Sequence, residues 1–131
     1  MKIDHIGIAV KSLELTAKAY ESLGLEVTST DSVWSEGVKV AFLPAGDTKI
    51  ELLEPLNADS VIAKFIEKRG EGVHHIALQV DDIEAAMKSA KEHGMQLINE
   101  EPKVGAHGRK VAFIHPKSTG GVLIELVQVT S

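Results

Sequence analysis

Two histidines and two glutamates interrupt runs of apolar residues at corresponding places in this chain of 131 residues. His5 and His75 each lie in a β-branched, alternating run, and Glu51 and Glu125 each stand between an isoleucine and a leucine. Because strand side chains alternate between two faces, a charge on a buried face is costly unless it is paired or bound to a metal. Two imidazoles and two carboxylates suit Co²⁺, Mn²⁺, Ni²⁺, Fe²⁺ or Zn²⁺. The sequence therefore predicts one divalent metal ion held by His5, Glu51, His75 and Glu125.

An internal repeat supports this prediction. When the two halves of the sequence are aligned, His5 matches His75 and Glu51 matches Glu125. The matching stretches are residues 3–10 with 73–80, 39–43 with 110–114, and 50–52 with 124–126, at offsets of 70, 71 and 74. The offset grows only between predicted strands, as expected for loop insertions in a structural repeat. The two His–Glu pairs are thus the same two strand positions used twice.

The elements that position these residues follow the same repeat. The alternation of apolar residues predicts strands over residues 2–10, 25–31, 38–44 and 48–54, and again over 73–80, 96–100, 110–115 and 122–129. Helix signals follow the opening strand of each half: Ser12 as N-cap with Gly24 as stop, then Asp81 and Glu84 as a capping box with Gly94 as stop. A connecting helix is expected over residues 59–70, capped by Asp59 or Ser60.

The predicted fold class is α+β. Two tandem βαβββ modules are expected to pair into a curved, incompletely closed mixed sheet around the metal site. The chain is predicted to be a single domain over residues 1–131, with module 1 at about 1–56 and module 2 at about 72–131. The connecting helix lies between them.

Composition excludes several classes of function. The formal net charge of −5 disfavours a general nucleic-acid binder. The absence of cysteine excludes disulfides, thiolate zinc sites and thiol nucleophiles, and it fits a reducing compartment. We expect no signal peptide and no membrane span, because the sequence has no suitable apolar run. A cytoplasmic location is therefore expected.

The remaining histidines have weaker claims to a role in the site. His74 neighbours His75 and is expected on the opposite face of the strand. His107 matches Glu36 at an offset of 71, so a position facing the cavity stays open for it. His93 is expected to end a helix, where an imidazolium complements the helix dipole.

The chain resembles the vicinal-oxygen-chelate superfamily, whose members pair βαβββ modules and bind a metal through their opening and closing strands. Within it, the chain looks most like the methylmalonyl-CoA epimerases. The stretches that carry this resemblance are residues 4–10, 49–56, 68–77 and 115–126. The resemblance implies a metal-dependent epimerase acting on an acyl-CoA, with Co²⁺ as the favoured ion, and a homodimer. Some epimerases have Gln where this chain has Glu51, and glyoxalase I has Glu there.

The resemblance also implies a pair of acid–base groups. Interconversion of (2R)- and (2S)-methylmalonyl-CoA requires one group to remove the C2 proton and another to return one. The candidates are Glu36, in a turn before a strand, and Glu125, which is also a predicted metal ligand. The loop Lys117–Gly121 fits either a contact with phosphate or pantetheine groups or an ordinary polar turn.

Three alternatives share the predicted fold. Glyoxalase I would use the same four ligands on a glutathione hemithioacetal. A non-enzymatic binding module of the same superfamily would usually lack a complete ligand set. An extradiol dioxygenase would use two histidines and one carboxylate on iron, and Glu51 as a fourth ligand argues against it.

Overall fold

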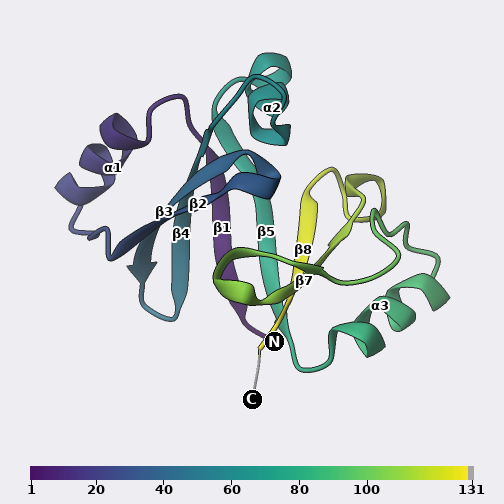
Figure 1. Ribbon diagram of the computed structural model, residues 1–131. Coiled ribbons are helices and arrows are strands. Elements are labelled where there is room, and N and C mark those ends of the chain that lie inside the picture. Colours follow the sequence, from purple (N-terminus) through teal and green to yellow (C-terminus); the bar gives the residue numbers. More distant parts are fainter. Residues whose placement is uncertain (130–131) are drawn as a thin grey trace. The chain divides into compact units, whose positions relative to one another are not determined.

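The computed structural model describes residues 1–129, and its chain divides into two compact units. The first unit comprises His5–His74, and the second comprises residues 1–4 together with 75–129. The ribbon follows β1, α1, β2, β3 and β4, then α2, and then β5, α3, β6, β7 and β8 (Figure 1). The predicted α+β class with two βαβββ modules is confirmed.

The first unit contains four strands in the order β2-β3-β4-β1. The pair of β1 and β4 is parallel, whereas β3 runs antiparallel to both β2 and β4. The elements are β1 (Ile3–Ala9), α1 (Leu13–Ser22), β2 (Ser29–Val33), the 3₁₀ turn η1 (Trp34–Glu36), β3 (Val38–Ala45), β4 (Thr48–Pro55) and α2 (Val61–Arg69).

The second unit repeats this order as β6-β7-β8-β5. Here β5 and β8 are parallel, and β7 is antiparallel to both β8 and β6. The elements are β5 (Gly72–Val80), α3 (Ile83–Glu92), β6 (Lys103–Val104), the 3₁₀ turns η2 (Ala106–Gly108) and η3 (Pro116–Ser118), β7 (Lys110–Ile114) and β8 (Leu123–Gln128). The start of the chain belongs to this unit, because the backbone N–H of Gln79 donates to the Lys2 carbonyl at 2.9 Å.

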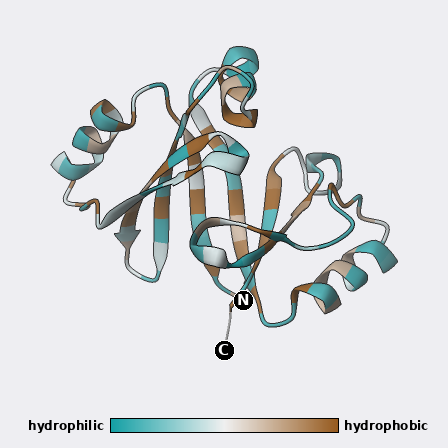
Figure 2. Cartoon of the chain, in the orientation of Figure 1, coloured by the Kyte–Doolittle hydropathy of each residue, from teal (hydrophilic) through white to brown (hydrophobic). Residues whose placement is uncertain are grey.

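Each unit buries an apolar cluster between its first helix and one face of its strands. In the first unit, Leu13 and Ala17 of α1 pack with Leu43 and Leu52, both of which are fully buried. In the second unit, Ile83 and Met87 of α3 pack with Ala112, Ile114 and Leu126. The strands carry bands of both hydrophobic and hydrophilic residues (Figure 2), so the opposite strand face is available for polar side chains.

The strand that carries each glutamate also fixes the helix behind it. Three residues after Glu51, the Glu54 carboxylate accepts the backbone N–H of Leu13 at 2.8 Å. Three residues after Glu125, the Gln128 side-chain oxygen accepts the N–H of Ile83 at 3.0 Å. An odd spacing places these residues on the face opposite the glutamates. Each helix therefore begins at a point set by the glutamate-bearing strand.

Most predicted helix ends are confirmed, and one is wrong. The Ser12 hydroxyl accepts the N–H of Leu15, and the Ser60 hydroxyl accepts that of Ala63. Gly24 and Gly94 follow their helices with positive φ, as predicted. The capping box of Asp81 with Glu84 is wrong, because Asp82 is the N-cap and accepts the N–H of Ala85 at 3.1 Å.

Two predicted strands also differ from the structure. The strand expected over 25–31 begins at Ser29, because Leu25 still bonds back to the last turn of α1. The strand expected over 96–100 is wrong: among the described residues it is reduced to a bridge between Leu97 and Ile114. There, the Asn99 side chain accepts the N–H of Phe113 at 2.8 Å and so replaces a backbone acceptor of the ladder. The paired strand β6 forms later, at Lys103–Val104.

Among the described residues, no helix is long and apolar enough to span a membrane.

Candidate metal centre

A buried His–Glu pair is built into the parallel strands of the first unit. Gly7 pairs with Glu51 across β1 and β4, and His5 lies two residues before Gly7. Two residues along a strand return to the same face, so His5 and Glu51 point the same way. His5 Nδ1 lies 3.1 Å from Glu51 Oε2, and each residue is only 6% exposed.

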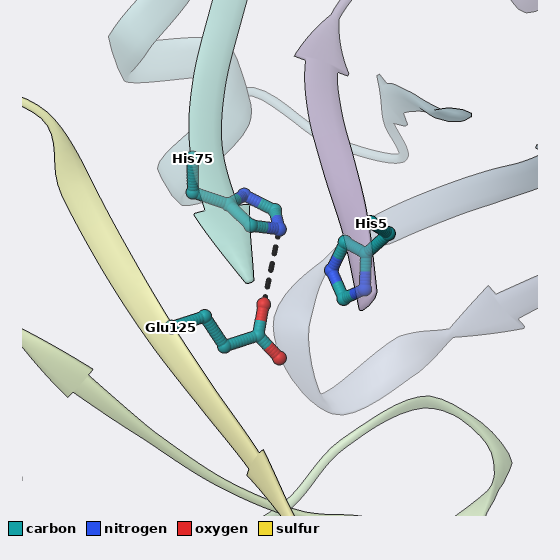
Figure 3. Close-up of side chains that lie close together, drawn as sticks. All are labelled: His5, His75 and Glu125. Atoms are coloured by element: carbon teal, nitrogen blue, oxygen red, sulfur yellow. Dashed lines mark ion pairs between the residues drawn. The ribbon is translucent and has the colours of Figure 1, made fainter. Parts of the chain in front are cut away.

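The second unit builds the same pair at the same register. Ala77 pairs with Glu125 across β5 and β8, and His75 lies two residues before Ala77. Figure 3 shows the His75 ring extending from β5 toward the Glu125 carboxylate on β8. His75 Nε2 lies 3.0 Å from Glu125 Oε1, and the two residues are 6% and 7% exposed. The repeat predicted from the sequence therefore holds at the level of strand register and side-chain contact.

An aromatic residue lies opposite each glutamate. Phe42 on β3 pairs with Glu51, and Phe113 on β7 pairs with Glu125. The Phe113 ring also meets the His75 ring edge-on, with the ring centroids 6.3 Å apart. Directly paired residues of antiparallel strands share a face, so each carboxylate has an apolar neighbour that limits its contact with water. Low local polarity strengthens electrostatic interactions with a bound cation.

The donor set fits a divalent transition metal. Each pair offers one imidazole nitrogen and one carboxylate oxygen separated by 3.0 or 3.1 Å. Two ligands bound at right angles, each with a bond of about 2.1 Å to the ion, would be about 3 Å apart. Imidazole and carboxylate together match the ligand preferences of Co²⁺, Mn²⁺, Ni²⁺, Fe²⁺ and Zn²⁺.

Glu36 is the last residue of η1, and its side chain is partly buried. Gly37 follows it in the left-handed conformation, with φ 65° and ψ 37°. In the second unit His107, which the repeat matches to Glu36, lies in η2 and is exposed. Its φ is 61°, and among the described residues it is the only non-glycine residue with a positive φ.

The other residues considered from the sequence have local roles. His74 is partly buried and packs edge-on against Phe65 at a centroid distance of 5.0 Å. The His93 ring lies 2.7 Å from the Ser89 carbonyl at the end of α3. In the loop Lys117–Gly121, the Ser118 hydroxyl accepts the N–H of Gln96, and the Thr119 hydroxyl donates to the Val122 carbonyl. These bonds support the interpretation of this loop as a polar turn.

Sequence reasoning missed a polar network beside His5. Asp4 is 2% exposed and accepts hydrogen bonds from Gln79 Nε2 at 2.9 Å and from Arg109 Nη1 at 3.0 Å. Asp4 directly precedes His5 in the chain, so this network anchors the residue next to it. The available signal was a carboxylate at a strand position next to His5, which requires a partner when it is buried.

The sequence matches the family model described as the glyoxalase/bleomycin resistance protein/dioxygenase superfamily over residues 4–113. The chain belongs to this superfamily. The resemblance to vicinal-oxygen-chelate proteins inferred from the sequence is therefore confirmed.

Several of the proteins to which the chain is similar are named as epimerases. The chain is 45% identical to human mitochondrial methylmalonyl-CoA epimerase over 97% of this chain and 73% of that protein. It is 46% identical to ethylmalonyl-CoA/methylmalonyl-CoA epimerase of Cereibacter sphaeroides, with 98% of each chain covered. It also matches a solved variant of Streptomyces coelicolor methylmalonyl-CoA epimerase in complex with 2-nitronate-propionyl-CoA, with a TM-score of 0.94, 38% identity, and 100% and 96% coverage.

The Asp4 network yields a prediction about stability. Replacing Arg109 with Met would leave the buried Asp4 carboxylate without this charged partner, so the free energy of unfolding should fall by about 1–3 kcal/mol. Urea denaturation followed by circular dichroism measures this change. Lys110→Met is the matched control, because Lys110 is exposed and directly follows Arg109. Equal stability of the two variants would contradict the assigned role.

Proposed function

We propose that the protein is a methylmalonyl-CoA epimerase that interconverts the (2R) and (2S) forms of its substrate. The observation that carries this proposal is the buried His–Glu pair repeated at one register in both units. The named relatives support the substrate class, because those with 45% and 46% identity are epimerases of methylmalonyl-CoA or of ethylmalonyl-CoA and methylmalonyl-CoA.

His5, Glu51, His75 and Glu125 are proposed to hold one divalent cation together. Each unit would contribute one nitrogen and one oxygen donor, and a cation held by these four residues would still be able to bind oxygens of the substrate. When bound, a divalent cation supplies positive charge at the enolate oxygen that develops as C2 loses its proton. Phe42 and Phe113 then keep the ligand carboxylates in apolar surroundings.

The two proton transfers are assigned to Glu36 and Glu125. The Glu36 carboxylate takes the proton from one face of C2, and the electrons of the broken C–H bond enter the enolate. A second group, protonated beforehand, returns a proton to the opposite face, and for this step we propose Glu125. Because a bond to the cation would lower the basicity of the Glu125 carboxylate, Glu36 is the group that we assign to proton removal.

Three finer features belong to the same proposal. We propose Co²⁺ as the ion from the family resemblance, because imidazole and carboxylate donors by themselves suit several divalent ions. A homodimer is proposed from the family resemblance. A cytoplasmic location is proposed because a chain without cysteine needs no oxidising compartment for folding.

Exchange at C2 tests the activity directly. In D₂O, cobalt-loaded protein should replace the C2 proton of methylmalonyl-CoA with deuterium, and proton NMR follows the loss of that signal. Protein stripped with a chelator should give no exchange, and restored metal should recover it. Glyoxalase I remains the competing activity because Glu51 matches its ligand. Conversion of a glutathione hemithioacetal to lactoylglutathione without C2 exchange would favour glyoxalase I and overturn the proposal.

The role of Glu36 is tested by Glu36→Gln, which keeps the size of the side chain but removes its basicity. Epimerisation should fall by at least about 100-fold, which is the lower range for loss of a general base. Cobalt content, measured by atomic emission, should stay the same because Glu36 is not a proposed ligand. The control Glu26→Gln alters an exposed carboxylate of the same unit and should retain activity. Full activity in Glu36→Gln would exclude Glu36 as the base.

A further inference from the structure

The turn that carries Glu36 approaches the start of α2 unusually closely. A Cβ atom placed on Gly37 would lie 2.9 Å from the Ser60 Cβ and 3.2 Å from the Asn57 side chain. Carbon atoms in contact prefer about 3.5–4.0 Å. Gly37 therefore has two constraints at once, a positive φ and a neighbour that occupies the space of a side chain.

The surface against which Gly37 packs is held firmly. The Gly37 carbonyl accepts the N–H of Leu56 at 2.8 Å, and its own N–H donates to the Trp34 carbonyl at 3.2 Å. Ser60 is 5% exposed, and its hydroxyl accepts the N–H of Ala63 at 3.0 Å as the N-cap of α2. Since Ser60 is fixed by the helix that it caps, any misfit must be absorbed by the turn.

The matching turn of the second unit lacks this contact. Gly108 occupies the position that the repeat matches to Gly37, and it has a similar φ of 70°. A Cβ atom on Gly108 would meet no atom within 4 Å. The left-handed glycine is thus a property of both turns, whereas the close approach belongs to the turn that carries Glu36.

We propose that the Gly37–Ser60 contact is a positioning element for Glu36. Because a Cβ at position 37 would overlap Ser60, only glycine allows η1 to approach α2 this closely, and this close approach sets the distance of η1 from α2. The inference rests on the proposed role of Glu36 as the base that acts at C2. In this inference, α2, the helix between the two modules, holds the turn η1 that carries Glu36 in position.

Gly37→Ala tests the contact. The added methyl group must push the turn away from Ser60 by up to about 1 Å, and misplacement on that scale can cost about 100-fold in rate. We expect kcat to fall by about this factor, with KM and cobalt content nearly unchanged. Gly108→Ala carries the same backbone penalty without the collision and should retain activity.

A second change at Ser60 tests whether the activity lost in Gly37→Ala can be restored. Ser60→Gly alone removes the contact and should lower kcat severalfold. Ser60→Ala keeps the Cβ but loses the hydroxyl that caps α2, so its free energy of unfolding should fall by about 1 kcal/mol while its kcat falls less than that of Ser60→Gly. Glycine is also tolerated at an N-cap. In the double variant Gly37→Ala/Ser60→Gly, the alanine methyl occupies the vacated space, so kcat should recover to within a few fold. Gly37→Ala/Ser60→Ala should show no recovery.

A readout independent of activity separates this inference from the proposed function. Trp34 is the sole tryptophan of the chain, lies in the same turn and is 76% exposed. Its fluorescence and its quenching by iodide should change in Gly37→Ala and remain unchanged in Gly108→Ala. Both should return to the wild-type values in the double variant Gly37→Ala/Ser60→Gly. If Glu36→Gln stays active while this pattern holds, the assigned base is wrong but the contact stands.

Other outcomes would overturn the inference itself. Wild-type kcat and fluorescence in Gly37→Ala would show that the contact does not position the turn. Failure of the folded double variant to recover would show that the loss does not arise from the contact with Ser60. If Gly37→Ala does not fold, Ser60→Gly and Ser60→Ala still form a matched pair on the native glycine, and equal kcat values for these two variants would exclude the proposed role.

Discussion

The fold depends on one interaction made twice, a buried histidine facing a buried glutamate across a pair of parallel strands. His5 and His75 each lie two residues before the partner of a glutamate, so strand register alone brings nitrogen and oxygen to within 3.0 or 3.1 Å. Burying either group alone would be costly, because neither could recover the hydration it loses. Pairing lowers that cost, and a shared cation would lower it further.

The rest of each unit holds that register in place. The strand that presents the glutamate on one face presents an amide or carboxylate oxygen three residues later on the other, and this oxygen receives the first N–H of α1 or α3. The helix then packs its apolar face on the strands. A shift of one residue in either strand would reverse both faces together, so helix packing and the placement of the His–Glu pair specify the same register.

The sequence predicted the placement of the two His–Glu pairs, which lie on regular strands. Glu51 and Glu125 were placed by the repeat, because strand periodicity determines which face a side chain occupies. Irregular backbone was harder to predict: Asn99 replaces a ladder acceptor by its side chain, and Asp82 competes successfully with Asp81 for the cap. The Gly37–Ser60 contact joins segments 23 residues apart, and no local pattern encodes such a distance.

Titration of metal-free protein with Co²⁺, followed by the visible d–d absorption of bound cobalt, tests the central claim most directly. If both His–Glu pairs hold a single ion, the titration should end at one cobalt per chain, and His5→Ala or His75→Ala should each abolish tight binding. His74→Ala should bind as the wild type does. An end point of two cobalt ions per chain, or a variant that loses one pair and still binds one ion tightly, would contradict the account.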